Sequence, residues 1–289
     1  MKNILAIKRT VIACGIISLS ACTSFIPEKH ISSIEEQKPA VTPIFQTLIL
    51  PDSSVYEGQM RNSLFNGTGK LTWRNGTYYK GEFKDGLFEG FGKLVNLYGD
   101  IYKGQFHQGL YHGAGSITYL NGDQYHGEFK DNLKSGSGTL VFSNGDRYEG
   151  QFKKDVFQGE GEMLLINQGK YHGDFVNGRF EGKGVYNFKN GQSYTGEFLN
   201  GRFHGQGKML YENGNRYEGE FENGLKHGKG KFTWGNGDYY MGRFNKDNKN
   251  GVGICQFRQV AAECHYRDNE LINFGNQHDP REKNFRYRT

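Results

Sequence analysis

Apolar and polar residues alternate along most of this chain in short runs, and the same run returns at a fixed interval. The interval is marked by a tyrosine that recurs nine times. A glycine follows two residues after each of these tyrosines, and a phenylalanine follows four residues after it, except for Met60 in the first copy. Alternate residues of a β-strand point to the same side, so Tyr, Gly and Phe share one face. The tyrosines stand 23 residues apart at Tyr56, Tyr79, Tyr102, Tyr125, Tyr148, Tyr171, Tyr194, Tyr217 and Tyr240. This period indicates an array of one small supersecondary unit.

Each unit continues with a turn and a second strand. Asp85-Gly86 and Asn223-Gly224 illustrate the turn, in which glycine supplies the positive φ that a tight reversal needs. Further glycines follow eleven and thirteen residues after each tyrosine, and Asn-Gly pairs such as Asn213-Gly214 lead into the next unit. The expected fold class is all-β: an elongated antiparallel single-sheet meander of stacked hairpins, with eighteen strands in nine repeats.

Glycine inside a strand normally weakens it, yet three glycine columns hold 27 of the 43 glycines. Aromatic rings can lie flat across backbone that has no Cβ, which gives a thin sheet its packing. We therefore interpret the Tyr and Phe columns as structural. The alternative is that they also form a binding face.

The string Tyr217-Glu218-Gly219-Glu220-Phe221-Glu222-Asn223-Gly224, with Gly228 and Gly230 after it, resembles the MORN (membrane occupation and recognition nexus) repeat. The resemblance covers residues 55–253 and departs locally, for example at Met60, Asn132 and Asp247. It implies a sheet of stacked hairpins. It also implies a binding or scaffolding role, since enzymes with such repeats carry their catalytic domain as a separate globular unit.

The N-terminus predicts export and lipid attachment. Residues 1–21 combine Lys2, Lys8 and Arg9 with a short apolar stretch, the pattern of a secretory signal. Leu19-Ser20-Ala21-Cys22 resembles the bacterial lipobox, which implies acylation of Cys22 and, with Thr23 and Ser24 after it, an outer-membrane location. Several acyl chains give stable membrane anchoring. The alternative is an ordinary signal peptide with a chance cysteine.

Residues 22–54 hold four of the five prolines and predict a tether, although Ile44 to Leu50 is apolar enough for an opening strand. The net charge is +5 with the signal and +5 − 3 = +2 without it. A nearly balanced surface gives no reason to expect nucleic acid as a partner.

Residues 254–289 leave the 23-residue pattern and predict a cap hairpin with a polar tail, too short for a catalytic domain. Cys255 and Cys264 remain after the signal is removed, and export favours a disulfide that pins the last sheet edge. The alternative is two reduced or separately buried thiols. His265 lacks partners at zinc spacing, so no metal site is expected.

No motif for catalysis or cofactor binding occurs, and no catalytic residue or cofactor is expected. Three positions after most tyrosines stands Glu or Gln, such as Glu82 and Gln105, which we interpret as a cross-strand charge ladder. His112, His204 and His227 share one offset in the repeat, and equivalent positions in successive hairpins are two strands apart, too far to share one ion.

These observations predict a lipid-anchored, non-enzymatic scaffold protein of the bacterial cell envelope whose partner is an envelope protein. Self-association through sheet edges is a further expectation. The alternative is direct binding of lipid or cell-wall glycan by exposed rings nine residues after the tyrosines. These candidate rings are Phe65, Phe88, Tyr111, Phe157, Phe180 and Phe203.

Overall fold

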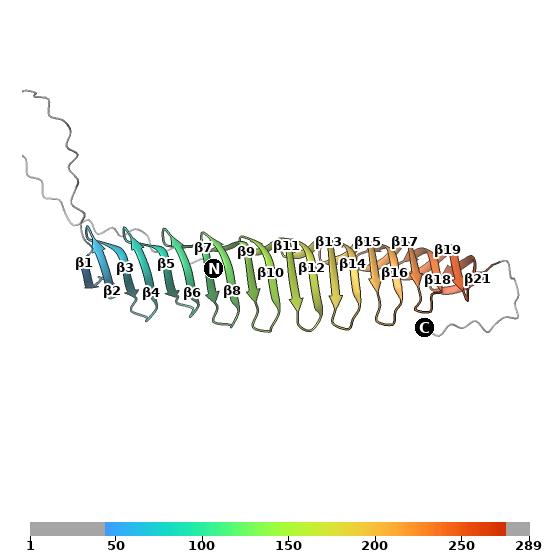
Figure 1. The fold of residues 1–289 in the computed structure, drawn as a ribbon, viewed down its shortest axis with the longest axis horizontal. Coiled ribbons are helices and arrows are strands. Elements are labelled where there is room, and N and C mark those ends of the chain that lie inside the picture. The colour runs from blue at the N-terminus through green and yellow to red at the C-terminus, as the bar shows by residue number, and fades with distance from the viewer. Residues whose placement is uncertain (1–43, 276–289) are drawn as a thin grey trace, which may run out of the picture. The chain divides into compact units, whose positions relative to one another are not determined.

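The computed structural model describes residues 44–275, which form one open antiparallel sheet of 21 strands without a helix in that range. Each strand pairs with its neighbours in chain order, so the sheet is a meander (Figure 1). The strands are β1 (Ile44–Ile49), β2 (Val55–Arg61), β3 (Leu64–Thr72), β4 (Tyr78–Lys84), β5 (Leu87–Val95), β6 (Ile101–His107), β7 (Leu110–Thr118), β8 (Gln124–Lys130), β9 (Leu133–Val141), β10 (Arg147–Lys153), β11 (Val156–Leu165), β12 (Gly169–Val176), β13 (Arg179–Phe188), β14 (Ser193–Leu199), β15 (Arg202–Leu210), β16 (Arg216–Glu222), β17 (Leu225–Thr233), β18 (Tyr239–Asn245), β19 (Asn248–Phe257), β20 (Val260–Arg267) and β21 (Glu270–Phe274). Strands β2 to β19 are the eighteen predicted from the repeat.

Two-residue turns close the hairpins. Asp85 and Gly86 have φ angles of 50° and 86°, the left-handed pair of a type I′ turn. Where the second glycine of a repeat is missing, Ser63, Asn132, Asp155 or Asp247 takes its place with φ of 61–71° and keeps the turn. The side-chain oxygen of Asn132 then accepts a hydrogen bond from the backbone N–H of Tyr111 at 2.8 Å, which ties the turn to the preceding hairpin.

A row of paired glycines crosses the sheet from Gly58 to Gly242, and we call it the glycine row. The repeated tyrosine rings lie on this row, on the side that we call the aromatic face. A Cβ at Gly104 would lie 2.6 Å from the hydroxyl oxygen of Tyr102. The repeated tyrosines are at most 1% exposed. The interpretation of these rings as packing on glycine is confirmed.

Each repeated tyrosine is also held by its hydroxyl. The hydroxyl donates to the backbone carbonyl three residues later, at 2.6–3.0 Å in all nine repeats. The repeated phenylalanine meets the tyrosine edge-on, with ring centroids 5.0 Å apart for Tyr79 and Phe83. A tyrosine in a core needs a packed ring and a hydrogen-bond partner for its hydroxyl, and each repeated tyrosine has both.

Alkali is expected to unfold this sheet between about pH 10 and 12. Burial raises the pKa of Tyr56, Tyr148 and Tyr194 to about 12, from an ordinary value of 10.0. A raised folded-state pKa means that the stabilisation is complete below pH 10 and is lost as the pH rises through the folded value. Tyrosinate absorbance and circular dichroism recorded together test this: tyrosinate forming in these residues while the sheet stays intact would contradict it.

The chain ends of the sheet are built differently from the repeats. Strand β1 pairs with β2, so the apolar stretch from Ile44 does form an opening strand at one edge. At the other end β19 runs on to Phe257, so the predicted boundary after residue 253 falls inside this strand. Strands β20 and β21 then form a last hairpin.

This last hairpin is an altered tenth repeat. In the register of the sheet, Ala262 takes the tyrosine position opposite Cys255, Cys264 takes the position of the glycine row, and Tyr266 takes the phenylalanine position. Cys255 and Cys264 are buried and joined in a disulfide, with Cα atoms 5.7 Å apart. Because Ala262 has no ring to lie on the backbone, a side chain fits where the other repeats need glycine.

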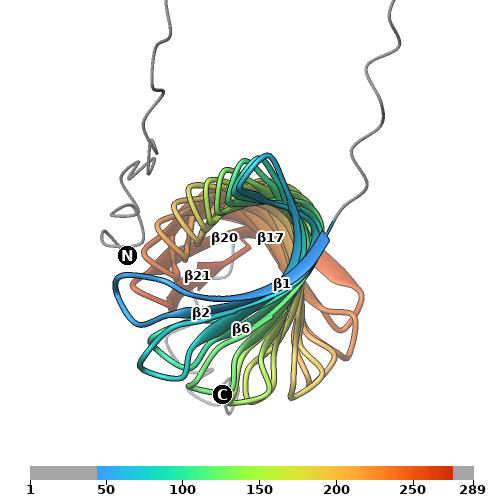
Figure 2. The same ribbon diagram turned by 90° about the vertical axis from the view of Figure 1, so that its left-hand side faces the viewer.

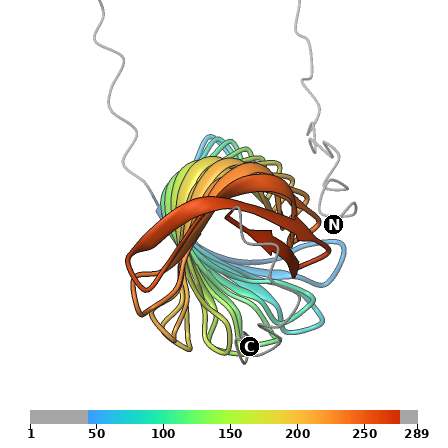
Figure 3. The same cartoon turned by 90° about the vertical axis from the view of Figure 1, so that its right-hand side faces the viewer.

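The predicted signal (residues 1–21), lipidation site Cys22, most of the tether (22–43) and the polar tail (276–289) lie outside the described residues. A search of residues 44–275 for a helix long and apolar enough to cross a membrane found none. Within the sheet, successive hairpins rotate about the long axis, as the two end views show (Figures 2 and 3). This rotation is the usual twist of β-sheets.

Candidate functional site

The six candidate rings are part of the packing. Each stacks on the tyrosine of its own repeat, with centroids 3.8–3.9 Å apart and planes within 8–20°. Tyr111 is buried, and the others are half-buried: Phe65, Phe88, Phe157, Phe180 and Phe203. The expectation that these rings are exposed is therefore wrong, because each covers the outer side of a tyrosine that already lies on glycine. A role in binding lipid or glycan stays a prediction.

The Glu and Gln column is a backbone cap rather than a charge ladder. Glu82 accepts a hydrogen bond from the N–H of Phe91 at 3.0 Å, and Gln105 accepts one from Ala114 at 3.2 Å. Both lie at β-bulges, where the register of the hairpin shifts and backbone groups lack strand partners. Within residues 44–275 no group of His, Cys, Asp and Glu is arranged to hold a metal ion.

The face opposite the tyrosines carries side chains in two rows, one on each side of the glycine row. One row holds the residues one and fourteen positions after each tyrosine, and the other holds those three and twelve positions after it. The glycine between the two rows belongs to the same face as the tyrosines, so only backbone lies between the rows on this opposite face. A shallow trough therefore runs over the glycine row on this opposite face.

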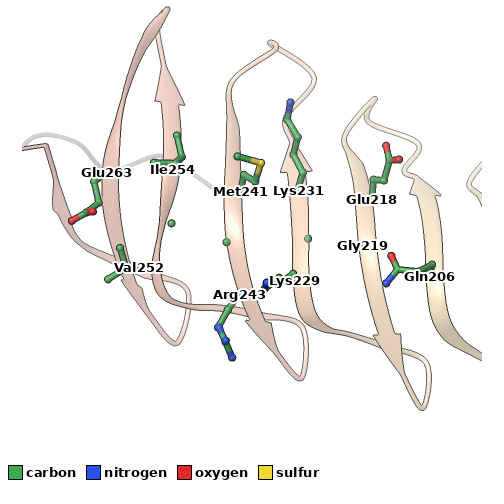
Figure 4. A pocket seen from close by; sticks show the side chains of 13 residues that line it. Gln206, Glu218, Gly219, Lys229, Lys231, Met241, Arg243, Val252, Ile254 and Glu263 are labelled. Carbon is green, nitrogen blue, oxygen red and sulfur yellow. The ribbon is translucent and has the colours of Figure 1, made fainter.

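The trough includes a depression of about 600 Å³ over β15 to β20, which is open to solvent (Figure 4). Met241 and Ile254 pair across β18 and β19 in one row, and Val252 lies in the other. These three apolar side chains, which we call the apolar patch, are 39–59% exposed. The charged side chains around the depression are Glu218, Lys229, Lys231, Arg243 and Glu263.

This arrangement has features of a binding surface. Apolar side chains next to cations recur at protein interfaces, where a desolvated centre is surrounded by polar groups. The depression holds Glu218 on β16 and Glu263 on β20, with β17 to β19 between them in the sheet. Side chains of a paired general acid and base must both reach one substrate.

A single meander of hairpins defines a β-repeat protein, and its open trough is a surface on which a partner can bind. The model of the MORN repeat matches nine stretches of the chain, and the chain belongs to this family. The matched residues are 56–78, 79–95, 102–124, 125–147, 148–170, 171–193, 194–216, 217–239 and 240–259. The resemblance noted in the sequence is confirmed for all nine repeats.

A search of curated proteins found no match to this chain. Among solved structures, the TCP domain of SAS-4 (dCPAP) of Drosophila melanogaster, in complex with a proline-rich motif of Ana2 (dSTIL), is 11% identical and covers 85% of this chain and 99% of that one, with a TM-score of 0.24. An inactive virginiamycin B lyase from Staphylococcus aureus with quinupristin is 9% identical over 79% of this chain and 92% of that one, with a TM-score of 0.17. At these TM-scores neither likeness carries an argument.

Proposed function

We propose that this protein is a lipid-anchored, non-enzymatic scaffold of the bacterial cell envelope that binds a protein partner through the apolar patch. The observation that carries the proposal is this patch. Met241, Val252 and Ile254 stand on open sheet surface, with no other element of the described chain over them. A cluster of this kind with charged residues around it is typical of a binding surface.

The repeated tyrosines and phenylalanines do not line the apolar patch, which supports the same assignment. The repeated tyrosines and phenylalanines are consumed by packing, so binding falls to the opposite face. The anchor is proposed from the sequence around Cys22. Acyl chains on that residue would hold the sheet at a membrane, and the stretch before β1 would give it reach.

Crosslinking in cells tests the scaffold function. The full-length protein is purified after crosslinking, beside Cys22→Ser, and captured proteins are identified by mass spectrometry. We expect one discrete envelope protein with the anchored form and its loss with Cys22→Ser. Recovery of the chain alone, or of lipid and glycan without protein, would reject a protein partner.

A variant in the patch separates binding from location. Val252→Asp puts a charge in the patch, where Val252 is 59% exposed and contributes little to stability. We expect at least about tenfold weaker capture of the same partner. Leu120→Asp is the matched control, because Leu120 is an exposed apolar residue in a loop between β7 and β8. Equal capture by both variants would remove the apolar patch from the proposal.

A further inference from the structure

Four lysines stand side by side on the opposite face of the sheet. Lys70 pairs with Lys80, Lys80 with Lys93, and Lys93 with Lys103, on the successive strands β3 to β6. They occupy the row one and fourteen positions after the tyrosines, and we call them the lysine row. Like charges directly opposite in a sheet are destabilising, so an unbroken run of four is unexpected for a surface shaped by folding alone.

In the described part of the chain, Lys208 of the same row forms an ion pair, and these four lysines do not. Lys208 faces Glu218 across β15 and β16, with 2.9 Å between Nζ and the carboxylate oxygen. Among the described residues, no ion pair is formed by any member of the lysine row. Glu57 lies opposite Lys70 in the register of β2 and β3, and Glu82, two residues after Lys80, accepts a hydrogen bond from the backbone N–H of Phe91.

Aromatic side chains flank the lysine row on both sides. The ammonium groups of Lys70 and Lys93 lie 5.5 and 5.3 Å from the centre of the Tyr78 ring, which positions both cations. Phe91 lies on β5, two residues before Lys93 and on the same face, and its side chain is 61% exposed. A line of cations between two aromatic rings offers charge and flat apolar surface to one ligand.

We infer that the lysine row binds a linear acidic polysaccharide, a chain of sugars that each carry a carboxylate, laid across strands β3 to β6. Neighbouring strands are about 4.8 Å apart, so the four ammonium groups form a line that the carboxylates of an extended hexuronate chain can follow. The apolar faces of the sugar rings pack on Phe91 and Tyr78. This site is separate from the apolar patch on β18 and β19.

The twist of the sheet disfavours a flat polyanionic surface as the ligand. Adjacent strands rotate by about 20–25°, so four successive lysines fan out through roughly 60–75°. A flexible polymer follows this rotation (Figure 2), whereas a flat membrane contacts only part of the row.

The test is a binding titration of the full-length protein with oligogalacturonate long enough to cross the lysine row. The matched neutral probe is the same oligomer as its methyl ester, and the other probes are polyglutamate and phosphatidylglycerol vesicles. We expect binding of the acid form alone, and at least about tenfold weakening in the double variant Lys80→Gln, Lys93→Gln. The control pair is Lys130→Gln with Lys153→Gln, exposed lysines on β8 and β10.

Each other outcome overturns the inference. Equal weakening by the control pair would show that net charge alone attracts the polymer. Binding of polyglutamate or vesicles with the same dependence on Lys80 and Lys93 would assign the row to an acidic peptide or to a membrane. The thermal midpoint of the double variant checks its fold, and it is expected to stay equal or to rise, because repulsion between neighbouring lysines is removed.

Discussion

Tyr148→Ala is expected to lower the free energy of unfolding by about 3–5 kcal/mol, the cost of truncating a buried aromatic side chain. The ring is fully buried between the glycine row and Phe157, which stacks on it at 3.9 Å. It also meets Phe175 of the next repeat edge-on at 5.0 Å, so its loss uncouples two neighbouring hairpins. Denaturant unfolding followed by circular dichroism measures the change.

Tyr148→Phe separates the ring from its hydroxyl. This variant keeps the packing and loses only the hydrogen bond to the carbonyl of Gln151, 2.8 Å long, so it is expected to cost about 1 kcal/mol. Because a repeat array is stabilised by nearest neighbours, hydrogen exchange should show the Tyr148→Ala loss concentrated in β9 to β12. Equal effects of both variants would mean that the ring itself contributes little.

The sequence predicts most of this fold because one repeat explains it. Strands, turns and the packing of rings on glycine all follow from columns that recur every 23 residues, and local contacts between neighbours leave little for the tertiary structure to override. The tenth repeat escaped detection because it has Ala262 in place of tyrosine. It also begins 22 residues after Tyr240, so it falls out of register with the column.

The candidate binding surfaces were harder to predict than the fold. The net charge is nearly balanced once the residues of the predicted signal are left out, and it hides the lysine row because charges are segregated along the sheet rather than mixed. Lys70 and Lys80 belong to different repeats, at different offsets, and become neighbours only through the pairing of β3 with β4. The lysine row becomes visible in the sequence only when the opposite-face residues of neighbouring strands are aligned in the register of the sheet.

The exposure of the six candidate rings was predicted wrongly for a related reason. A ring nine residues after a tyrosine follows a turn, and turns are normally at the surface. In this sheet the turn returns the chain so that Phe88 lies directly over Tyr79. A single sheet has no second layer to cover its core, so it must cover the first layer of rings with a second layer of its own side chains.

Gly104→Ala is expected to be as damaging as the loss of a core ring, although it adds only one methyl group. The new Cβ would lie 2.5 Å from the Cα of Gly115 and 2.6 Å from the hydroxyl oxygen of Tyr102. The backbone of Gly115 cannot move away without opening the pairing of β6 with β7. The ring of Tyr102 cannot move away without leaving its buried site. We expect a loss of about 3 kcal/mol or more in the free energy of unfolding, measured by denaturant titration.

Gly109→Asn is the matched control because it also fills a glycine of the third repeat. Gly109 has φ 83° at a turn, and nothing lies within 4 Å of an added Cβ. Asn132 already occupies the equivalent position of the next repeat with φ 70°, so this substitution should cost about 1 kcal/mol or less. A Gly104→Ala protein as stable as Gly109→Asn would show that the rings do not need bare backbone beneath them, and the account of the glycine row would fail.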